Sequence, residues 1–174
     1  MSLNVNAGSE PSPVSEAGGL GASYEAEQIV MKSMRAAMIA GLVPVPVVDM
    51  AALMAIHVRM LSRLSKLYGV EFSDQLGKST IGSLVGAGTS LLASATSQRV
   101  LSRLIPLTGW PVVAINTSFF GGASTYALGK IFIQHFDSGG TLLTFDPEKV
   151  RQYYAQQLAE GNAEVRKSFV GVRP

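Results

Sequence analysis

Hydrophobic and polar positions along the chain follow a helical period, and alternating apolar–polar runs bounded by hairpin turns are almost absent. The pattern predicts a first helix over residues 24–40. Ser23 is its N-cap, and Glu25 and Glu27 occupy the first turn, where carboxylates favour a helix start. Gly41 ends this helix. We therefore expect an all-α fold.

The segment after Gly41, GLVPVPVVDM, contains two prolines that impose an extended bend before the next helix. We expect the second helix over residues 47–68, with Gly69 as its C-terminal stop. The first half of this helix is apolar. Its second half carries Arg59, Arg63 and Lys66 at intervals of about one turn, so the helix is amphipathic.

A third helix is expected to begin after Ser73, which can serve as its N-cap, and to continue to about residue 104. The segment IPLTGWP then predicts a turn. A fourth helix should start at Pro111 and run to about residue 136, where the segment DSGG closes it.

The fifth helix has the clearest start signal in the chain, with Asp146 as N-cap, Pro147 at the first helical position and Glu148 after it. Residues 161–174 are polar and are expected to form a C-terminal tail. The first 23 residues are rich in Gly, Ser and Pro, which is typical of a flexible tail. We thus expect a helical domain over residues 24–160 between two tails.

Two long stretches without a charged residue lie in the centre of the chain. Residues 79–98 form a run of 20 uncharged residues, and residues 104–129 form a run of 26. Twenty helical residues span about 30 Å, the thickness of the hydrocarbon core of a bilayer. The length favours two transmembrane helices, and the alternative is that both are central helices of a soluble bundle.

Small residues recur in both uncharged runs at helical spacing, which lets two helix backbones approach closely. In the first run they are Gly82, Gly86, Ser90 and Ser94, and in the second they are Gly121, Gly122, Ala123 and Ala127. The connection between the runs is short. We therefore expect a bundle of about five helices built around a central antiparallel helical hairpin with small-residue packing faces.

Composition narrows the choice of environment. Charged residues make up only 15% of the chain, against about 25% in an average soluble protein. The net charge of +2 is too small, and the basic residues are too scattered, for a nucleic-acid-binding protein. If the hairpin spans a membrane, the basic residues flanking it favour both chain ends on the cytoplasmic side.

No pattern of a known catalytic, cofactor or metal site is complete. The segment GKST at residues 77–80 ends like a phosphate-binding loop, but the first glycine of that motif and the preceding strand are missing. The absence of Cys and the presence of only two His disfavour a metal centre. We expect no catalytic residues, no cofactor, no metal and no small-molecule substrate.

Three ionisable residues of the second helix remain as candidates for a buried polar cluster. Asp49 and His57 lie about 80° apart around the helix, close enough to share such a cluster with Arg59. The ordinary interpretation is a satisfied polar contact between packed helices. At membrane depth the same residues would be candidates for a proton or ion path, as in a transporter.

The residues also resemble a known family. The segment GLVPVPVVDMAALMAIHVRMLSRLSKLYGVEF, a Gly-rich helix and the segment ASTYALGKIFIQHFDSGG together resemble the YcjF-type domain of unknown function 697. The resemblance covers about residues 28–155. It implies a helical, membrane-associated bacterial domain that often follows a Ras-like GTPase domain. This sequence has no GTPase half, so a GTPase would have to be a separate partner.

The function that best fits these features is a non-enzymatic, membrane-associated helical module that self-associates or acts with a GTPase partner. Its expected location is the bacterial inner membrane or the cytoplasmic face of that membrane. The alternative is a soluble cytoplasmic scaffold that self-associates through the same small-residue faces.

Overall fold

Five α-helices make up the part of the chain that the computed structural model describes, namely residues 13–42, 48–95 and 98–170, and this part contains no strand. Side chains are described for residues 21–42, 50–86 and 117–169. The helices are α1 (Pro13–Ala40), α2 (Val48–Leu67), α3 (Asp74–Ala95), α4 (Gln98–Asp137) and α5 (Pro147–Val170). The prediction of an all-α bundle is confirmed.

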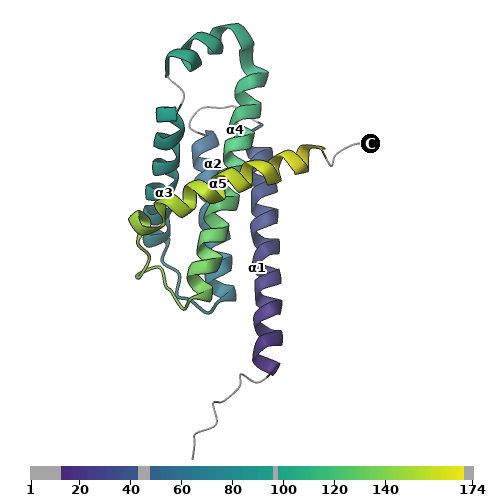
Figure 1. Ribbon diagram of the computed structural model, residues 1–174, viewed down its shortest axis with the longest axis vertical. Helices are drawn as coiled ribbons and strands as arrows, with labels where there is room; N and C mark the ends of the chain where they lie inside the picture. The colour runs from purple at the N-terminus through teal and green to yellow at the C-terminus, as the bar shows by residue number, and fades with distance from the viewer. Residues whose placement is uncertain (1–12, 43–47, 96–97, 171–174) are drawn as a thin grey trace, which may run out of the picture.

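Helix α4 lies at the centre of the bundle (Figure 1). It packs most extensively against α1 on one side and α5 on the other, and it touches α2 and α3 less. Helix α5 crosses α4 obliquely, while α1 and α2 run beside α4. The first part of α4 arches over from the end of α3. The small residues of α4 therefore pack mainly on α1 and α5, and less on α3 than the expected central hairpin would suggest.

The core is built from aliphatic and aromatic side chains of all five helices, spaced three or four residues apart so that each helix buries one face. The largest fully buried apolar side chains are Val30, Met34, Met60, Leu61, Leu64, Ile81, Leu84, Leu128, Ile131, Phe132 and Tyr154. Because these residues meet around α4, loss of any one of them would leave a cavity shared by several helices.

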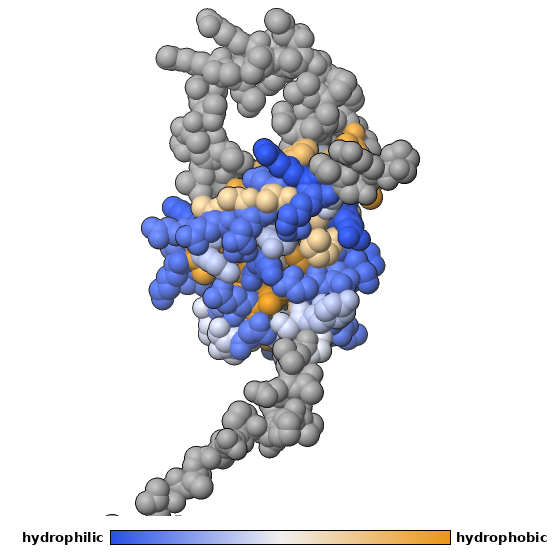
Figure 2. Space-filling model, turned by 45° about the vertical axis from the view of Figure 1, so that its right-hand side comes forward, coloured by the Kyte–Doolittle hydropathy of each residue, from blue (hydrophilic) through white to orange (hydrophobic). Residues whose placement is uncertain are grey.

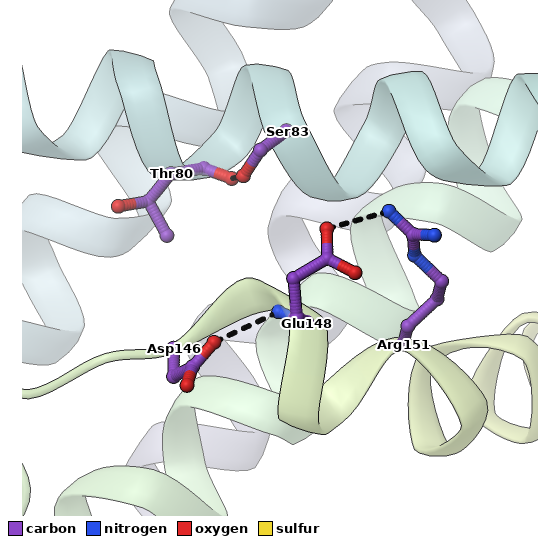
Figure 3. A network of polar contacts seen from close by, with 5 residues as sticks. All are labelled: Thr80, Ser83, Asp146, Glu148 and Arg151. Carbon is purple, nitrogen blue, oxygen red and sulfur yellow. Dashed lines mark hydrogen bonds and ion pairs between the residues drawn. The ribbon is translucent and has the colours of Figure 1, made fainter.

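Local signals in the sequence end and begin the helices as predicted. Gly69 follows α2 and Gly139 follows α4, each with a positive φ angle (66° and 77°) that glycine adopts without strain. At the start of α5, the backbone N–H of Glu148 donates to Oδ1 of Asp146 at 3.1 Å (Figure 3). Arg151 also donates to Glu148 in the first turn. The N-cap predicted for α5 is confirmed.

Four helix boundaries differ from the prediction. Helix α3 ends at Ala95 instead of continuing to about residue 104. Helix α1 begins at Pro13, so part of the expected N-terminal tail is helical, and proline suits a first helical position. Helix α4 begins at Gln98 and contains the expected turn at residues 106–111, since proline can bend a helix without ending it. Helix α5 continues through Gly161 to Val170, so most of the expected C-terminal tail is helical.

The two uncharged runs are described only in part, since their described side chains are those of residues 79–86 and 117–129. Among the described residues, no helix is both long enough and apolar enough to cross a bilayer, so the two transmembrane helices expected over residues 79–98 and 104–129 stay a prediction. The runs have the required length. Much of that length, however, is Gly, Ser, Thr and Ala, which gain little from transfer into hydrocarbon.

The contact between α5 and α4 gives a test of the packing. A Cβ at Gly161 would lie 2.7 Å from the carbonyl oxygen of Ala123, and a backbone atom cannot swing aside. We expect Gly161→Ala to lower the free energy of unfolding by about 1–3 kcal/mol in urea denaturation followed by circular dichroism. Gly21→Ala is the control, because Gly21 is exposed in α1 and no described atom lies within 4 Å of its added Cβ.

The control should be neutral, or up to about 1 kcal/mol more stable than wild type, because alanine favours a helix. Equal changes in the free energy of unfolding of the two variants would show that the close contact of α5 with α4 does not determine the cost of a side chain at residue 161.

Candidate functional site

Small side chains of α4 form a seam along which neighbouring helices come unusually close. The seam consists of Ser118, the adjacent pair Gly121 and Gly122, Thr125 and Gly129, at intervals of about one turn apart from that pair. It holds α1 and the end of α5 against α4, and it also contacts α2. Both predicted packing residues Gly121 and Gly122 lie in this seam, and Ala127 is fully buried in the core beside it.

Glycine is needed in the seam because there is no room for a side chain. A Cβ at Gly122 would lie 2.6 Å from Cγ of Met38 and 2.7 Å from Cγ2 of Val165. A Cβ at Gly121 would lie 3.3 Å from the carbonyl oxygen of Ala37. Gly121 and Gly122 thus allow α1 and α5 to reach the same turn of α4.

The end of α1 is fastened to the seam by a hydrogen bond. Ser118 Oγ donates to the carbonyl oxygen of Met38 at 2.6 Å, which satisfies one of the carbonyls left without an intrahelical partner at a helix C-terminus. The backbone of Gly41 lies directly against that of Ser118, since a Cβ at Gly41 would be 2.7 Å from the Ser118 Cα atom. These two contacts with α4 therefore fix the position of the end of α1.

His57 is the one buried imidazole contact between α2 and the seam. Its side chain is 1% exposed, and Nε2 lies 2.9 Å from Oγ1 of Thr125. The Thr125 hydroxyl donates its only hydrogen to the carbonyl oxygen of Gly121 at 2.6 Å. It must therefore accept a hydrogen from His57, which makes His57 the neutral tautomer protonated on Nε2. Burial also lowers the pKa of His57 to about 4.

The predicted cluster of Asp49, His57 and Arg59 is not assembled by the described side chains. His57 points into the core, whereas Arg59 is exposed on the outer surface of α2. Asp49 lies in α2, but its side chain is outside the described residues. The structure thus gives His57 a packing role, and it separates His57 from the arginine that a proton path would need nearby.

The predicted packing residues of α3 are placed differently from those of α4. Gly82 and Gly86 are exposed, and no described atom lies within 4 Å of a Cβ built at either position. Ser90 and Ser94 lie in α3 with side chains outside the described residues. Packing through these four residues, within or between chains, stays a prediction.

Sequence reasoning missed Thr125, Gly129 and Gly161 as close-packing residues. A signal for the first two was present, because Gly121, Thr125 and Gly129 follow one another at four-residue spacing, as a close-packed helix face requires. Gly161 carried no such signal. The sequence places residue 161 at the start of the expected C-terminal tail, whereas it is the point at which α5 crosses Ala123.

Among the described side chains, His, Cys, Asp and Glu do not gather in any group of three that could hold a metal ion. The cations of the surface are more distinctive. Arg59 and Arg63 of α2 stand between two grooves, one shared with α1 and one shared with α3. This part of the surface, rather than a catalytic pocket, is the candidate functional site.

The buried imidazole gives a prediction about pH. Between pH 6.5 and about 4, the unfolded chain binds a proton at His57 that the folded chain does not bind. The contribution of His57 to stability is therefore complete above pH 6.5 and is lost as the pH falls toward 4. Across that window we expect a loss of about 3 kcal/mol from this residue.

The measurement is the free energy of unfolding at several pH values, for wild type and for His57→Gln. Glutamine can still donate to Thr125 but does not titrate. Carboxylates titrate in both proteins, so the difference between the two curves isolates the imidazole. Parallel curves would mean that His57 is not buried in its neutral form.

Comparison with known proteins places the chain in a family. Residues 22–162 match the family described as a domain of unknown function, DUF697. The chain is 38% identical over 148 residues to magnetosome membrane protein 22 of Magnetospirillum gryphiswaldense, an alignment that covers 85% of this chain and 76% of that protein. No solved structure was found to match. The chain therefore belongs to the DUF697 family, the one that its sequence resembles.

Proposed function

We propose that this protein is a non-catalytic helical module that associates with one surface of a membrane. The observation that carries the proposal is the relative that shares 38% of its residues across most of both chains and is named a magnetosome membrane protein. The absence of a membrane-crossing helix among the described residues favours attachment to a surface.

The polar side chains described in the core hold helices in position and do not suggest a reaction. The buried polar contact at His57 joins α2 to α4, and the nearby hydroxyls of Thr125 and Ser118 are used in helix packing. A transporter-like path through Asp49, His57 and Arg59 gains no support, because Arg59 and His57 face opposite environments. These features support a module whose core fixes the positions of the helices that form its surface.

Self-association and a GTPase partner are further parts of the proposal. Gly82 is exposed in α3 and has no side chain, so the backbone of a helix from a second copy could pack closely against it. The frequent occurrence of this domain behind a Ras-like GTPase domain suggests the partner. A chain bound to one surface has both ends on the same side, and we propose the cytoplasmic side of a bacterial inner membrane.

Membrane attachment is tested by fractionating cells that express the full chain. We expect the protein in the membrane pellet at low salt, and we expect alkaline carbonate to release it, because carbonate removes proteins held only at the surface. An integral membrane protein expressed in the same cells is the control and should stay in the pellet.

Two other outcomes would contradict the proposal. Recovery in the soluble fraction at low salt would favour the alternative, a soluble scaffold. Retention in the pellet after carbonate treatment would indicate that the chain spans the membrane.

Self-association is tested by light scattering on the protein purified without detergent. We expect a mass above 18.4 kDa for wild type and a shift toward the monomer for Gly82→Ile, whose side chain would hold a second helix away. Lys149→Ile, an exposed substitution on α5, is the control and should leave the mass unchanged. A monomeric wild type would rule out self-association.

A further inference from the structure

The cations of the described surface fall into two groups. Those of α4 and α5 are mostly paired, as in Lys130–Glu27, Lys149–Asp146, Arg151–Glu148 and Lys167–Glu164. Within the described side chains, no ion pair involves the exposed cations of α1 and α2, which are Lys32, Arg35, Arg59, Arg63 and Lys66. We call these five residues the basic face.

The basic face is continuous across α1 and α2. Lys32, Arg59 and Arg63 line a groove of about 290 Å³ between these helices, together with Ser33, Ala36 and Ile56. Arg35 follows Lys32 by one turn of α1, and Lys66 follows Arg63 by one turn of α2. Three cations around one small groove, without an ion pair among the described side chains, produce a local positive potential.

On its other side the basic face borders a second groove, between α2 and α3. This groove has a volume of about 610 Å³ and is lined by apolar side chains, among them Met54, Val58 and Phe72. Arg59 and Arg63 form its edge on α2, and Lys78, paired with Asp74, forms its edge on α3. An apolar floor thus adjoins a row of cations.

Large apolar side chains are exposed within the same stripe of α1. Tyr24 is 69% exposed and Ile39 is 67% exposed. With about 100° of rotation per residue, Tyr24, Lys32, Arg35 and Ile39 fall within an arc of about 80°. Glu25 adjoins this arc, but it lies nearly two turns from Lys32. An aromatic, two cations and an aliphatic residue on one helix face are typical of a helix that lies at a membrane interface.

We propose that the basic face binds the phosphate groups of anionic phospholipids, with Ile39 and Tyr24 entering the region between headgroups and acyl chains. This inference rests on the proposed membrane association and names the surface and the lipid chemistry. Arginine is suited to the contact because its guanidinium can form two parallel hydrogen bonds to one phosphate. A nucleic acid would match the charge, but it would leave Ile39 in water.

Vesicle co-sedimentation of the full-length protein tests the inference. Vesicles of phosphatidylcholine containing phosphatidylglycerol are compared with vesicles of phosphatidylcholine alone. We expect wild type to bind the anionic vesicles much more strongly and to be released by high salt. Each cation near an anionic surface strengthens binding about five-fold, so Arg59→Gln combined with Arg63→Gln should weaken it about 25-fold.

The matched control removes two cations from another face, by Lys149→Gln combined with Arg166→Gln on α5. These residues are exposed, and α5 packs on α4 and α3. The control should bind nearly as well as wild type, although its net charge equals that of the arginine variant. Circular dichroism checks that both variants fold, as expected for exposed positions. Ile39→Ser, which keeps every charge, should also weaken binding.

The outcomes separate this inference from the proposed function. If wild type binds anionic vesicles and the arginine variant binds equally well, the module associates with membranes through another surface, and the inference fails alone. If wild type binds neither kind of vesicle, both fail. Release by inorganic phosphate beyond that by chloride at equal ionic strength would indicate a site for free phosphate and would also overturn the inference.

Discussion

The close approach of neighbouring helices to the small residues of α4 is the constraint on which the rest of the structure depends. Gly121 and Gly122 admit α1 and α5 to one turn of α4, and Thr125 admits the imidazole of His57 from α2. Backbones that come this close leave no space for water. Burial at this contact keeps His57 neutral, and its Nε2 bonds to Thr125.

This inner constraint determines which surfaces remain available. Burial of one face of α1 and α2 against α4 turns the opposite faces outward, and these faces carry the cations that lack an ion pair among the described side chains. The face that is visible in Figure 2 is mainly hydrophilic, with small, separated hydrophobic areas. Such a bundle can bind a membrane surface through its cations and a few inserted side chains while its own core stays buried.

The sequence was most informative where a local rule decides the structure. Gly69 and the N-cap at Asp146 ended and began helices as predicted, because their effect depends only on the adjacent backbone. The sequence was least informative about contacts between residues that lie far apart along the chain. The expected transmembrane hairpin relied on the length of the uncharged runs, whereas the described glycines of the second run serve close helix packing, as at Gly121. The close contact of Gly161 depends on the crossing of α5 over α4, and the exposure of Arg59 depends on which face of α2 turns outward.

The most direct test uses the absence of cysteine from the natural sequence, which makes any introduced thiol unique. An environment-sensitive fluorophore is attached to Ile39→Cys and, separately, to Ala163→Cys on the exposed face of α5. On adding anionic vesicles, we predict a blue shift and brighter emission from the label at residue 39, and little change from the label at residue 163. A shift only at residue 163, or equal shifts at both, would contradict binding through α1 and α2.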